Sequence, residues 1–183
     1  MSLSGRSANS VDELIRSASE RLSALARAHA LTLSHGLRHA PQAAKPTTLH
    51  SLIRAIIAPY EELDDAARPR FSIVGCDVEI AGAAVSSMAL LLHEFATNSA
   101  KHGSLSAAEG QIEIDCGNHG QTVVLTWTER EGPAVAPPVD NEGFGAILVR
   151  ATVKGQLGGD ISYDWGSEGL VIRLSIPRTR LSE

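Results

Sequence analysis

Four polar residues of this chain share one stripe of a segment that the sequence predicts to be a long helix. Glu94 and Asn98 are four residues apart, and Lys101 and His102 follow three and four residues after Asn98, which places them on one helical face. The Asn98 amide oxygen can ligate Mg²⁺, the Lys101 ammonium can neutralise phosphate charge, and the Glu94 carboxylate can accept a proton. This set suits a phosphate ester held with a hard cation. The alternative is a solvated polar face with an incidental pattern.

The pair His93-Glu94 has the first two residues of a zinc-protease motif. That motif requires a second histidine four residues after the first, and this chain has Thr97 there. The missing ligand excludes the zinc-protease interpretation.

Two further segments have residue types that suit a nucleotide site. Gly143-Phe144-Gly145 begins an expected helix, where glycines permit close backbone approach and free N–H groups bind phosphate. A tryptophan and an acid, Trp127 and Glu129, stand at the end of an expected strand and are followed by Gly132. Taken alone, each also fits an ordinary loop-to-helix turn or strand end.

Hydrophobic periodicity predicts the elements that must position these residues. A capping box at Ser10–Glu13 begins an amphipathic helix, whose apolar stripe packs either on its own domain or across a dimer. A second helix follows Thr48 and stops at Pro59. The remaining expected elements are strands at 70–74, 77–80, 111–116, 122–127, 161–165 and 170–176, with helices at 83–102 and 144–154 and a turn at 117–120.

This order is not a βαβ alternation. It predicts an α+β fold, in which a mixed and mostly antiparallel sheet has helices on one face and a helical segment precedes it.

Composition restricts the function further. The chain has 183 residues, 43% of them hydrophobic, and a formal net charge of -5. It can therefore bury a core, and it lacks the basic surface of a nucleic-acid-binding protein. No apolar run approaches the roughly 20 residues that span a bilayer, and the first residues lack the pattern of a signal peptide. Together with the two separate cysteines, Cys76 and Cys116, these features predict a cytoplasmic protein.

Three motifs in this order carry a family resemblance. The segment 92–103 resembles the N box of the histidine-kinase ATPase superfamily, the GHKL or Bergerat fold. Trp127 and Glu129 are similar to the Trp-x-Glu of its HWE subfamily of bacterial sensor histidine kinases, and Gly143–Gly145 resembles its second glycine box. The segment Arg21–His29 resembles the region that follows the phosphoacceptor in the same subfamily.

The resemblance implies a two-layer α/β sandwich and a role for each site residue. Glu94 and His93 would be catalytic, and Asn98 would hold the Mg²⁺ that bridges the ATP phosphates. Glu129 would read the adenine amino group. The other cofactor-binding residues implied are Lys101, His102, Gly132, Gly143, Phe144 and Gly145, with the loop 130–142 as a short lid.

It also implies an activity, partners and a division of the chain. The module would transfer the ATP γ-phosphoryl to a histidine and thence to an aspartate of a response regulator. Residues 47–183 would be the ATP-binding domain, and residues 1–46 a partial dimerisation segment that forms a homodimer through its helix.

Two departures from the family pattern bear on activity. The chain has Glu131 where the family has a glycine, which could weaken nucleotide binding and leaves a degenerate docking or phosphotransfer scaffold as the alternative. Replacing Glu131 by glycine is expected to tighten ATP binding a few-fold. The phosphoacceptor block is missing, so we expect it upstream of residue 1 and expect no autophosphorylation of this chain alone.

Overall fold

A computed structural model of the chain describes residues 6–34, 47–61, 69–134 and 144–182. Within them, five strands form one sheet in the order β1-β2-β3-β5-β4. The first pair, β1 and β2, is parallel, and all other neighbours are antiparallel. The strands are β1 Phe71–Gly75, β2 Gln111–His119, β3 Thr122–Arg130, β4 Asp160–Gly166 and β5 Gly169–Pro177. The mixed, mostly antiparallel sheet predicted from the sequence is confirmed.

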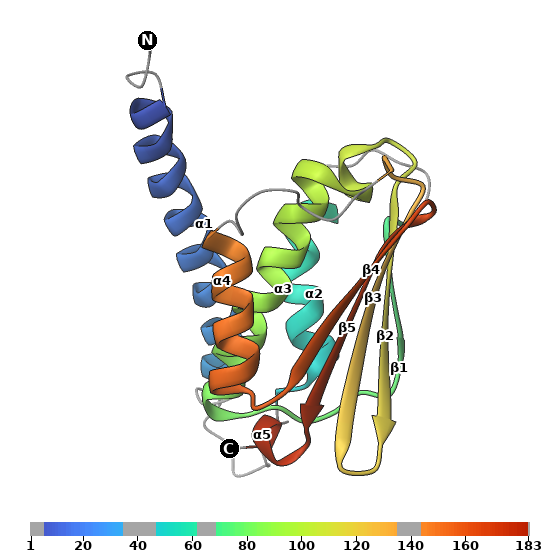
Figure 1. The fold of residues 1–183 in the computed structure, drawn as a ribbon. Coiled ribbons are helices and arrows are strands. Elements are labelled where there is room, and N and C mark those ends of the chain that lie inside the picture. Colours follow the sequence, from blue (N-terminus) through green and yellow to red (C-terminus); the bar gives the residue numbers. More distant parts are fainter. Residues whose placement is uncertain (1–5, 35–46, 62–68, 135–143, 183) are drawn as a thin grey trace.

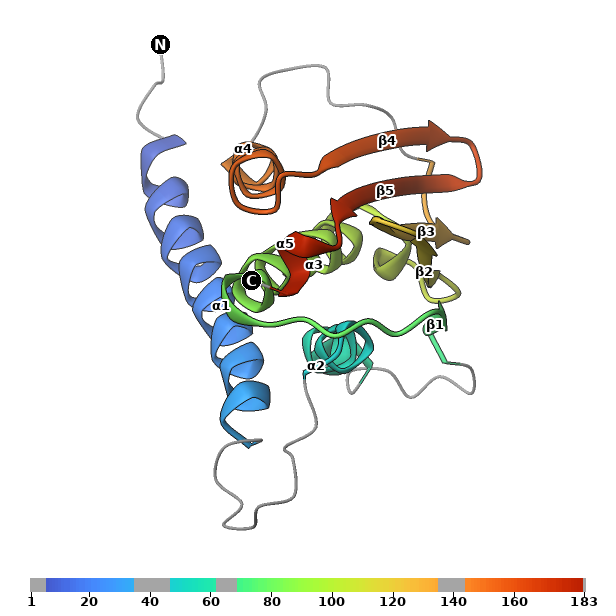
Figure 2. The same cartoon turned by 90° about the horizontal axis from the view of Figure 1, so that it is seen from below.

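The helices form a layer on one side of this sheet (Figures 1 and 2). Helices α2, α3 and α4 cover one face, and α1 packs on the outer side of α3 and α2. The described helices are α1 Arg6–Ser34, α2 Leu49–Glu61, α3 Gly82–His102, α4 Phe144–Ala151 and α5 Thr179–Ser182. Among the described parts of the chain, no helix is both long and apolar enough to cross a bilayer.

The core lies between α3 and the centre of the sheet. The period-two alternation of β2 and β3 directs Ile112, Ile114, Leu125 and Trp127 inward, where each is at most 1% exposed. The Trp127 ring meets the ring of Phe95 from α3 edge to face, with centroids 5.9 Å apart. This contact fixes α3 against β3, the two elements that carry most of the candidate site residues.

The expected strand at 77–80 does not form a ladder. Val78 and Ile80 are buried, but their backbone groups bond to the start of α2 instead of to another strand. The N–H of Leu49 donates to the carbonyl of Val78 at 2.8 Å, and the N–H of Ile80 donates to the carbonyl of Thr47 at 2.9 Å. This segment therefore anchors α2 against the core.

Two expected boundaries also differ. Strand β2 continues to His119, into the predicted turn, and the chain reverses at Gly120, whose φ of 68° is in the left-handed region, before β3 begins at Thr122 as expected. Helix α2 continues two residues beyond Pro59 to Glu61. A proline in the last turn of a helix interrupts only the hydrogen bond to the residue four before it, so the turn can still close.

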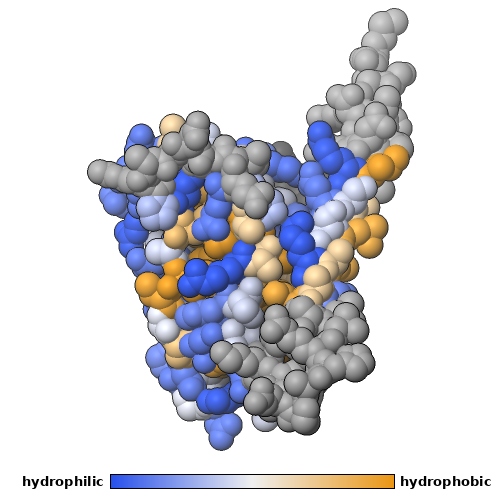
Figure 3. All heavy atoms as spheres, turned by 180° about the vertical axis from the view of Figure 1, so that it is seen from behind, coloured by the Kyte–Doolittle hydropathy of each residue, from blue (hydrophilic) through white to orange (hydrophobic). Residues whose placement is uncertain are grey.

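The apolar stripe of α1 is divided between the inside and the outside of the molecule. Ala24 and Ala28 are 0% exposed because they pack against the α2–α3 layer. Ile15 and Leu22 remain 59% and 66% exposed. Figure 3 shows apolar side chains along the outer edge of α1. Both interpretations of the stripe thus retain support: part of it packs on the same chain, and part is open to a partner. Val11 and Leu14, which belong to the same expected stripe, have side chains outside the described residues.

Candidate functional site

The polar stripe of α3 begins in the core and ends at the surface. Glu94 is 4% exposed, whereas Asn98, Lys101 and His102 are exposed. Lys101 and His102 occupy the last turn of α3, where positive charge interacts favourably with the helix dipole. The structure therefore confirms the helix that aligns these four residues, and it buries only the carboxylate.

An arginine from α1 pairs with the buried carboxylate. The Arg21 Nε donates to Glu94 Oε1 at 2.6 Å, and a terminal guanidinium nitrogen of Arg21 donates to Glu94 Oε2 at 3.1 Å. The side chains are only 18% and 6% exposed. A two-bond contact of this kind fixes the orientation of both groups, so α1 holds the carboxylate of α3 in place.

The start of α4 lies directly against the same carboxylate. A Cβ added to Gly145 would lie 2.6 Å from Glu94 Oε2, a separation that real Cβ atoms essentially never show. Glycine at 145 therefore lets α4 approach the carboxylate without displacing it from Arg21. Phe144 begins the helix, and Gly143, together with residues 135–142 of the expected lid, lies outside the described residues.

Glu129 lies at the other end of the stripe and already has two hydrogen-bond donors. It is 4% exposed and accepts from the N–H of Ser104 at 2.8 Å and from Trp127 Nε1 at 3.3 Å. A Cβ on Gly103 would lie 2.0 Å from Glu129 Oε2. The carboxylate thus caps the 3-10 turn Ser104–Ser106 that follows α3.

The loop after β3 passes closely over this turn. A Cβ on Gly132 would lie 2.5 Å from the Cα of Ser104, so only glycine fits. Its neighbour Glu131 is exposed and has a φ of 55°, the one left-handed non-glycine residue in the described part of the chain. This backbone conformation is the physical reason why a glycine would suit position 131.

His93 faces a different side of α3 from the stripe. It is 4% exposed, and its burial lowers the pKa of the imidazole below the ordinary value. It lines a cavity bounded by α1 and α2, away from Glu129 and Gly132. The structure therefore separates the two residues that the resemblance paired as catalytic: Glu94 contacts Arg21 and Gly145, and His93 lies in the α1–α2 cavity.

Sequence reasoning missed the role of Arg21. The segment 21–29 carries a family resemblance, but the sequence assigned no function to its arginines. Arg21 and Glu94 are 73 residues apart, and a pattern confined to one helix cannot pair residues at that distance. The available signal was a pair of opposite charges on two expected helices, which is too common to indicate a contact.

The donor set around the stripe fits a magnesium–nucleotide complex. Asn98 offers one exposed amide oxygen, one turn beyond Glu94, and Gly145 near the start of α4 lies against the Glu94 carboxylate. Mg²⁺ commonly takes only one or two protein ligands and completes its shell with water and substrate phosphates. No group of three or more histidine, cysteine or acidic residues that could hold a metal occurs within the described ranges.

Comparison with curated proteins gives relatives of one kind. A blue-light-activated histidine kinase of Rhizobium johnstonii is 35% identical over 159 residues, which cover 86% of this chain and 42% of that protein. Blue-light-activated histidine kinase 1 of Erythrobacter litoralis is 30% identical over 177 residues, or 96% of this chain and 47% of that protein. Over most of its length, this chain is therefore similar to part of these histidine kinases. It spans less than half the length of both relatives, and no protein-family model matches it.

Solved structures show that this chain shares the fold of histidine kinase catalytic domains. The blue-light-activated histidine kinase EL346 of Erythrobacter litoralis superposes with a TM-score of 0.73 at 20% identity, covering 92% of this chain and 50% of that one. The catalytic domain of histidine kinase ThkA superposes with a TM-score of 0.55 at 19% identity, covering 73% and 97%. The predicted Bergerat-type sandwich is thereby confirmed.

Substitutions of Arg21 and Glu94 should have non-additive effects on the free energy of unfolding. Breaking a buried pair from one side leaves an uncompensated charge, so Arg21→Met should lower the free energy of unfolding by about 3 kcal/mol. The double variant Arg21→Met/Glu94→Gln should recover a large part of that loss because no lone charge remains. Urea denaturation of the two single variants and the double variant measures the coupling. Additive losses would show that the two side chains do not interact in solution.

The backbone at Glu131 predicts a gain from glycine. Glu131→Gly should raise the free energy of unfolding by about 0.5–1 kcal/mol, because it relieves a left-handed φ at an exposed position. Glu131→Ala is the matched control: it removes the charge but keeps the Cβ, and it should leave stability almost unchanged. Equal gains in both variants, measured by thermal unfolding, would assign the effect to charge and contradict the backbone explanation.

Proposed function

We propose that this chain is the ATP-binding catalytic module of a cytoplasmic sensor histidine kinase. Residues 47–183 would bind Mg-ATP, and residues 1–46 would belong to a dimerisation segment. The module would transfer the γ-phosphoryl group to a histidine of a phosphoacceptor block that residues 1–46 do not contain. The observation that carries the proposal is the stripe from Glu94 to His102, with Gly145 so close that a Cβ there would displace the Glu94 carboxylate.

Each end of the stripe suits one part of the nucleotide. At the phosphate end, Asn98 would hold the magnesium ion, which neutralises phosphate charge when bound, and Lys101 would add a second positive charge. The N–H groups at the start of α4, beside Gly145, suit phosphate oxygens. At the other end, Glu129 and Gly132 flank the turn that follows α3. The remaining acceptor capacity of Glu129 suits the adenine amino group.

The transfer itself needs few protein groups. A nitrogen of the acceptor imidazole forms a bond to the γ-phosphorus, the bond from that phosphorus to the β–γ bridging oxygen breaks, and ADP leaves with the electron pair. The imidazole N–H proton must then be accepted, and Glu94 is the carboxylate of the stripe that suits this role. Most of the catalysis would come from positioning and charge neutralisation.

The described side chains of α1 support a dimer, and a similar solved structure supports a response regulator as partner. Ile15 and Leu22 lie seven residues apart on α1 and are more than half exposed, as in one seam of a helical dimer. The solved structures similar to this chain include ThkA in complex with the response regulator TrrA. We infer a homodimer through α1 and an aspartate-bearing response regulator as the final acceptor.

A scaffold that binds no nucleotide is the second candidate, and Glu131 favours it. The carboxylate stands in the loop that passes over Ser104, at the end of the stripe proposed for the base. Because Glu131 is exposed, solvent and salt reduce its effect on a bound nucleotide. The catalytic interpretation therefore has the stronger support.

Removal of the Asn98 amide should separate these two functions. Asn98→Ala is expected to weaken Mg-ATP binding about tenfold or more, because one metal ligand is lost. The same substitution at Asn118, an exposed residue near the β2–β3 turn, should have no effect on affinity. Calorimetric titration measures both variants, and circular dichroism checks the fold. Wild-type affinity in Asn98→Ala would exclude the stripe as the magnesium site, and failure of the parent chain to bind would favour the scaffold.

A further inference from the structure

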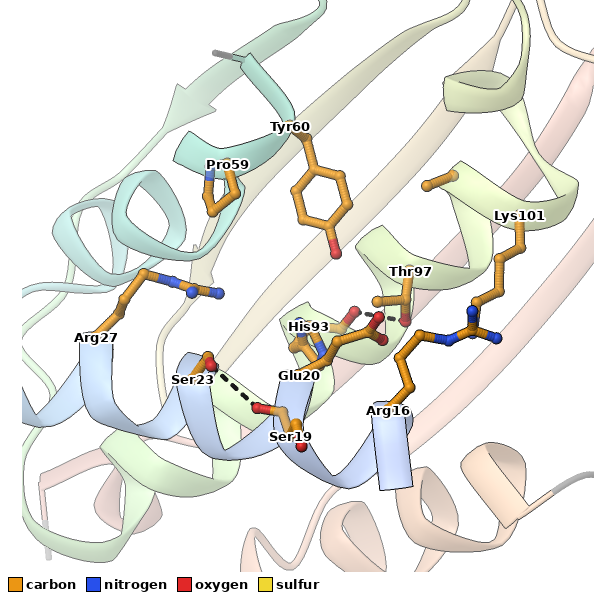
Figure 4. Close-up of a pocket in the computed structure, with 11 residues that line it drawn as sticks. Arg16, Ser19, Glu20, Ser23, Arg27, Pro59, Tyr60, His93, Thr97 and Lys101 are labelled. Atoms are coloured by element: carbon orange, nitrogen blue, oxygen red, sulfur yellow. Dashed lines mark hydrogen bonds between the residues drawn. The ribbon is translucent and has the colours of Figure 1, made fainter. Parts of the chain in front are cut away.

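A cavity of about 420 Å³ lies between α1, α2 and α3 (Figure 4). It is a different space from the nucleotide stripe, which is the polar stripe of α3 from Glu94 to His102 that is proposed to bind Mg-ATP. Arg16 and Arg27 of α1, Tyr60 of α2, and His93 and Lys101 of α3 contribute to its walls. In Figure 4, Arg16 and Lys101 lie toward one end of the cavity and Arg27 toward the other, with His93 and the Tyr60 hydroxyl between them. The resemblance assigns roles to His93 and Lys101, and the proposed function uses Lys101, but neither places a ligand between α1, α2 and α3.

The charges that line the cavity are mostly positive. Arg16, Arg27 and Lys101 carry three positive charges, and Glu20 supplies one negative charge. The chain as a whole has a formal net charge of -5, so the local charge of the cavity is opposite in sign to the net charge of the chain. A partly enclosed space with excess positive charge attracts anions.

Two polar atoms of the cavity walls have no partner. Arg27 Nε and His93 Nδ1 are buried, and no hydrogen-bond partner for either occurs in the described parts of the chain. His93 is only 4% exposed, so its Nδ1 has neither contact with bulk water nor a partner among the described residues. Buried polar atoms are ordinarily hydrogen-bonded, and an unpaired one is costly. A ligand with several acceptor oxygens would satisfy both.

The other polar groups of the cavity are suited to donate. Burial raises the pKa of the Tyr60 phenol to about 12, so it keeps its proton at neutral pH. The hydroxyls of Ser23 and Thr97 donate to backbone carbonyls within their own helices, which leaves their oxygens as acceptors. The donors that remain for a ligand are therefore mainly cationic groups, together with Tyr60, and these match a phosphate group.

We propose that the cavity between α1, α2 and α3 binds a small phosphate monoester, with the phosphate on Arg27 and His93. A volume of about 420 Å³ is within the range of small-molecule sites and exceeds what a free phosphate ion fills. Pro59, Ala100 and the Tyr60 ring supply an apolar wall for the organic part of the ester. The site bridges α1 and α3, the helices joined by the Arg21–Glu94 pair, so the ligand strengthens their contact.

Phenyl phosphate is the probe, because it combines a dianion with a small apolar body. Titration followed by calorimetry should show saturable binding to the chain, and phenol should not bind. Inorganic phosphate should bind more weakly than phenyl phosphate. Equal affinity for phenyl phosphate and inorganic phosphate would overturn the assignment of an ester. It would show that the cavity binds the free phosphate ion. Absence of binding by either would overturn the site and show that the cavity holds only water.

Two substitutions with opposite expected effects test the geometry. Arg27→Gln should weaken phenyl phosphate binding about tenfold, because it removes a charge-assisted donor, whereas Glu20→Gln should tighten it. Arg54→Gln, at an exposed position on α2, is the matched control and should change nothing. If Arg27 and Glu20 had only a structural role, the two substitutions would not change the affinity for phenyl phosphate in opposite directions. Equal effects of Arg27→Gln and Arg54→Gln would show non-specific attraction and overturn the proposal.

A comparison with the nucleotide stripe keeps this proposal distinct from the proposed function. Arg27→Gln should leave Mg-ATP binding unchanged, and Asn98→Ala should leave phenyl phosphate binding unchanged. Loss of phenyl phosphate binding in Asn98→Ala would show that the probe occupies the nucleotide stripe and would overturn a separate site. Because each ligand has its own sensitive residue, failure of one proposal does not imply failure of the other.

Discussion

The burial of α3 is the constraint on which the arrangement of this molecule depends. The helix packs against the sheet through Phe95 and Trp127 and against α2 and α1 on its other sides. A carboxylate in its buried stretch, Glu94, therefore cannot be left without a partner, because an isolated buried charge is very costly. Arg21 provides that partner, so the charge on α3 helps to hold α1 in place, together with the packing of Ala24 and Ala28.

This pairing connects the candidate catalytic carboxylate to the helix that would form the dimer. While Arg21 holds both oxygens of Glu94, the carboxylate is less available to accept a proton from an acceptor imidazole. A movement of α1 that breaks the pair would release it. The opposite side of α1 borders the cationic cavity, so the same helix contacts both proposed binding sites.

Much of the fold follows from local patterns, but the contacts within the site do not. The alternation in β2 and β3 and the stripe on α3 depend on neighbouring residues, which is why the sequence predicted them. The segment 77–80 alternates like a strand but bonds to α2, since its partner was decided by tertiary packing. Glu129 capping Ser104, the left-handed Glu131 and the pairing of Arg21 with Glu94 all require the assembled fold. The glycine at 145 was predicted for phosphate approach, and its closest contact is with Glu94.

Transfer of phosphate to a separately supplied acceptor tests the central claim most directly. The chain would be incubated with magnesium and γ-labelled ATP together with a histidine-containing dimerisation segment of a related kinase, with Glu94→Gln as the comparison. The account predicts that label appears on a histidine of the segment, bound by a phosphoramidate bond that acid cleaves and base does not, and that Glu94→Gln strongly reduces the rate. Binding of Mg-ATP without any labelled histidine, or equal labelling by the Glu94→Gln variant, would contradict it.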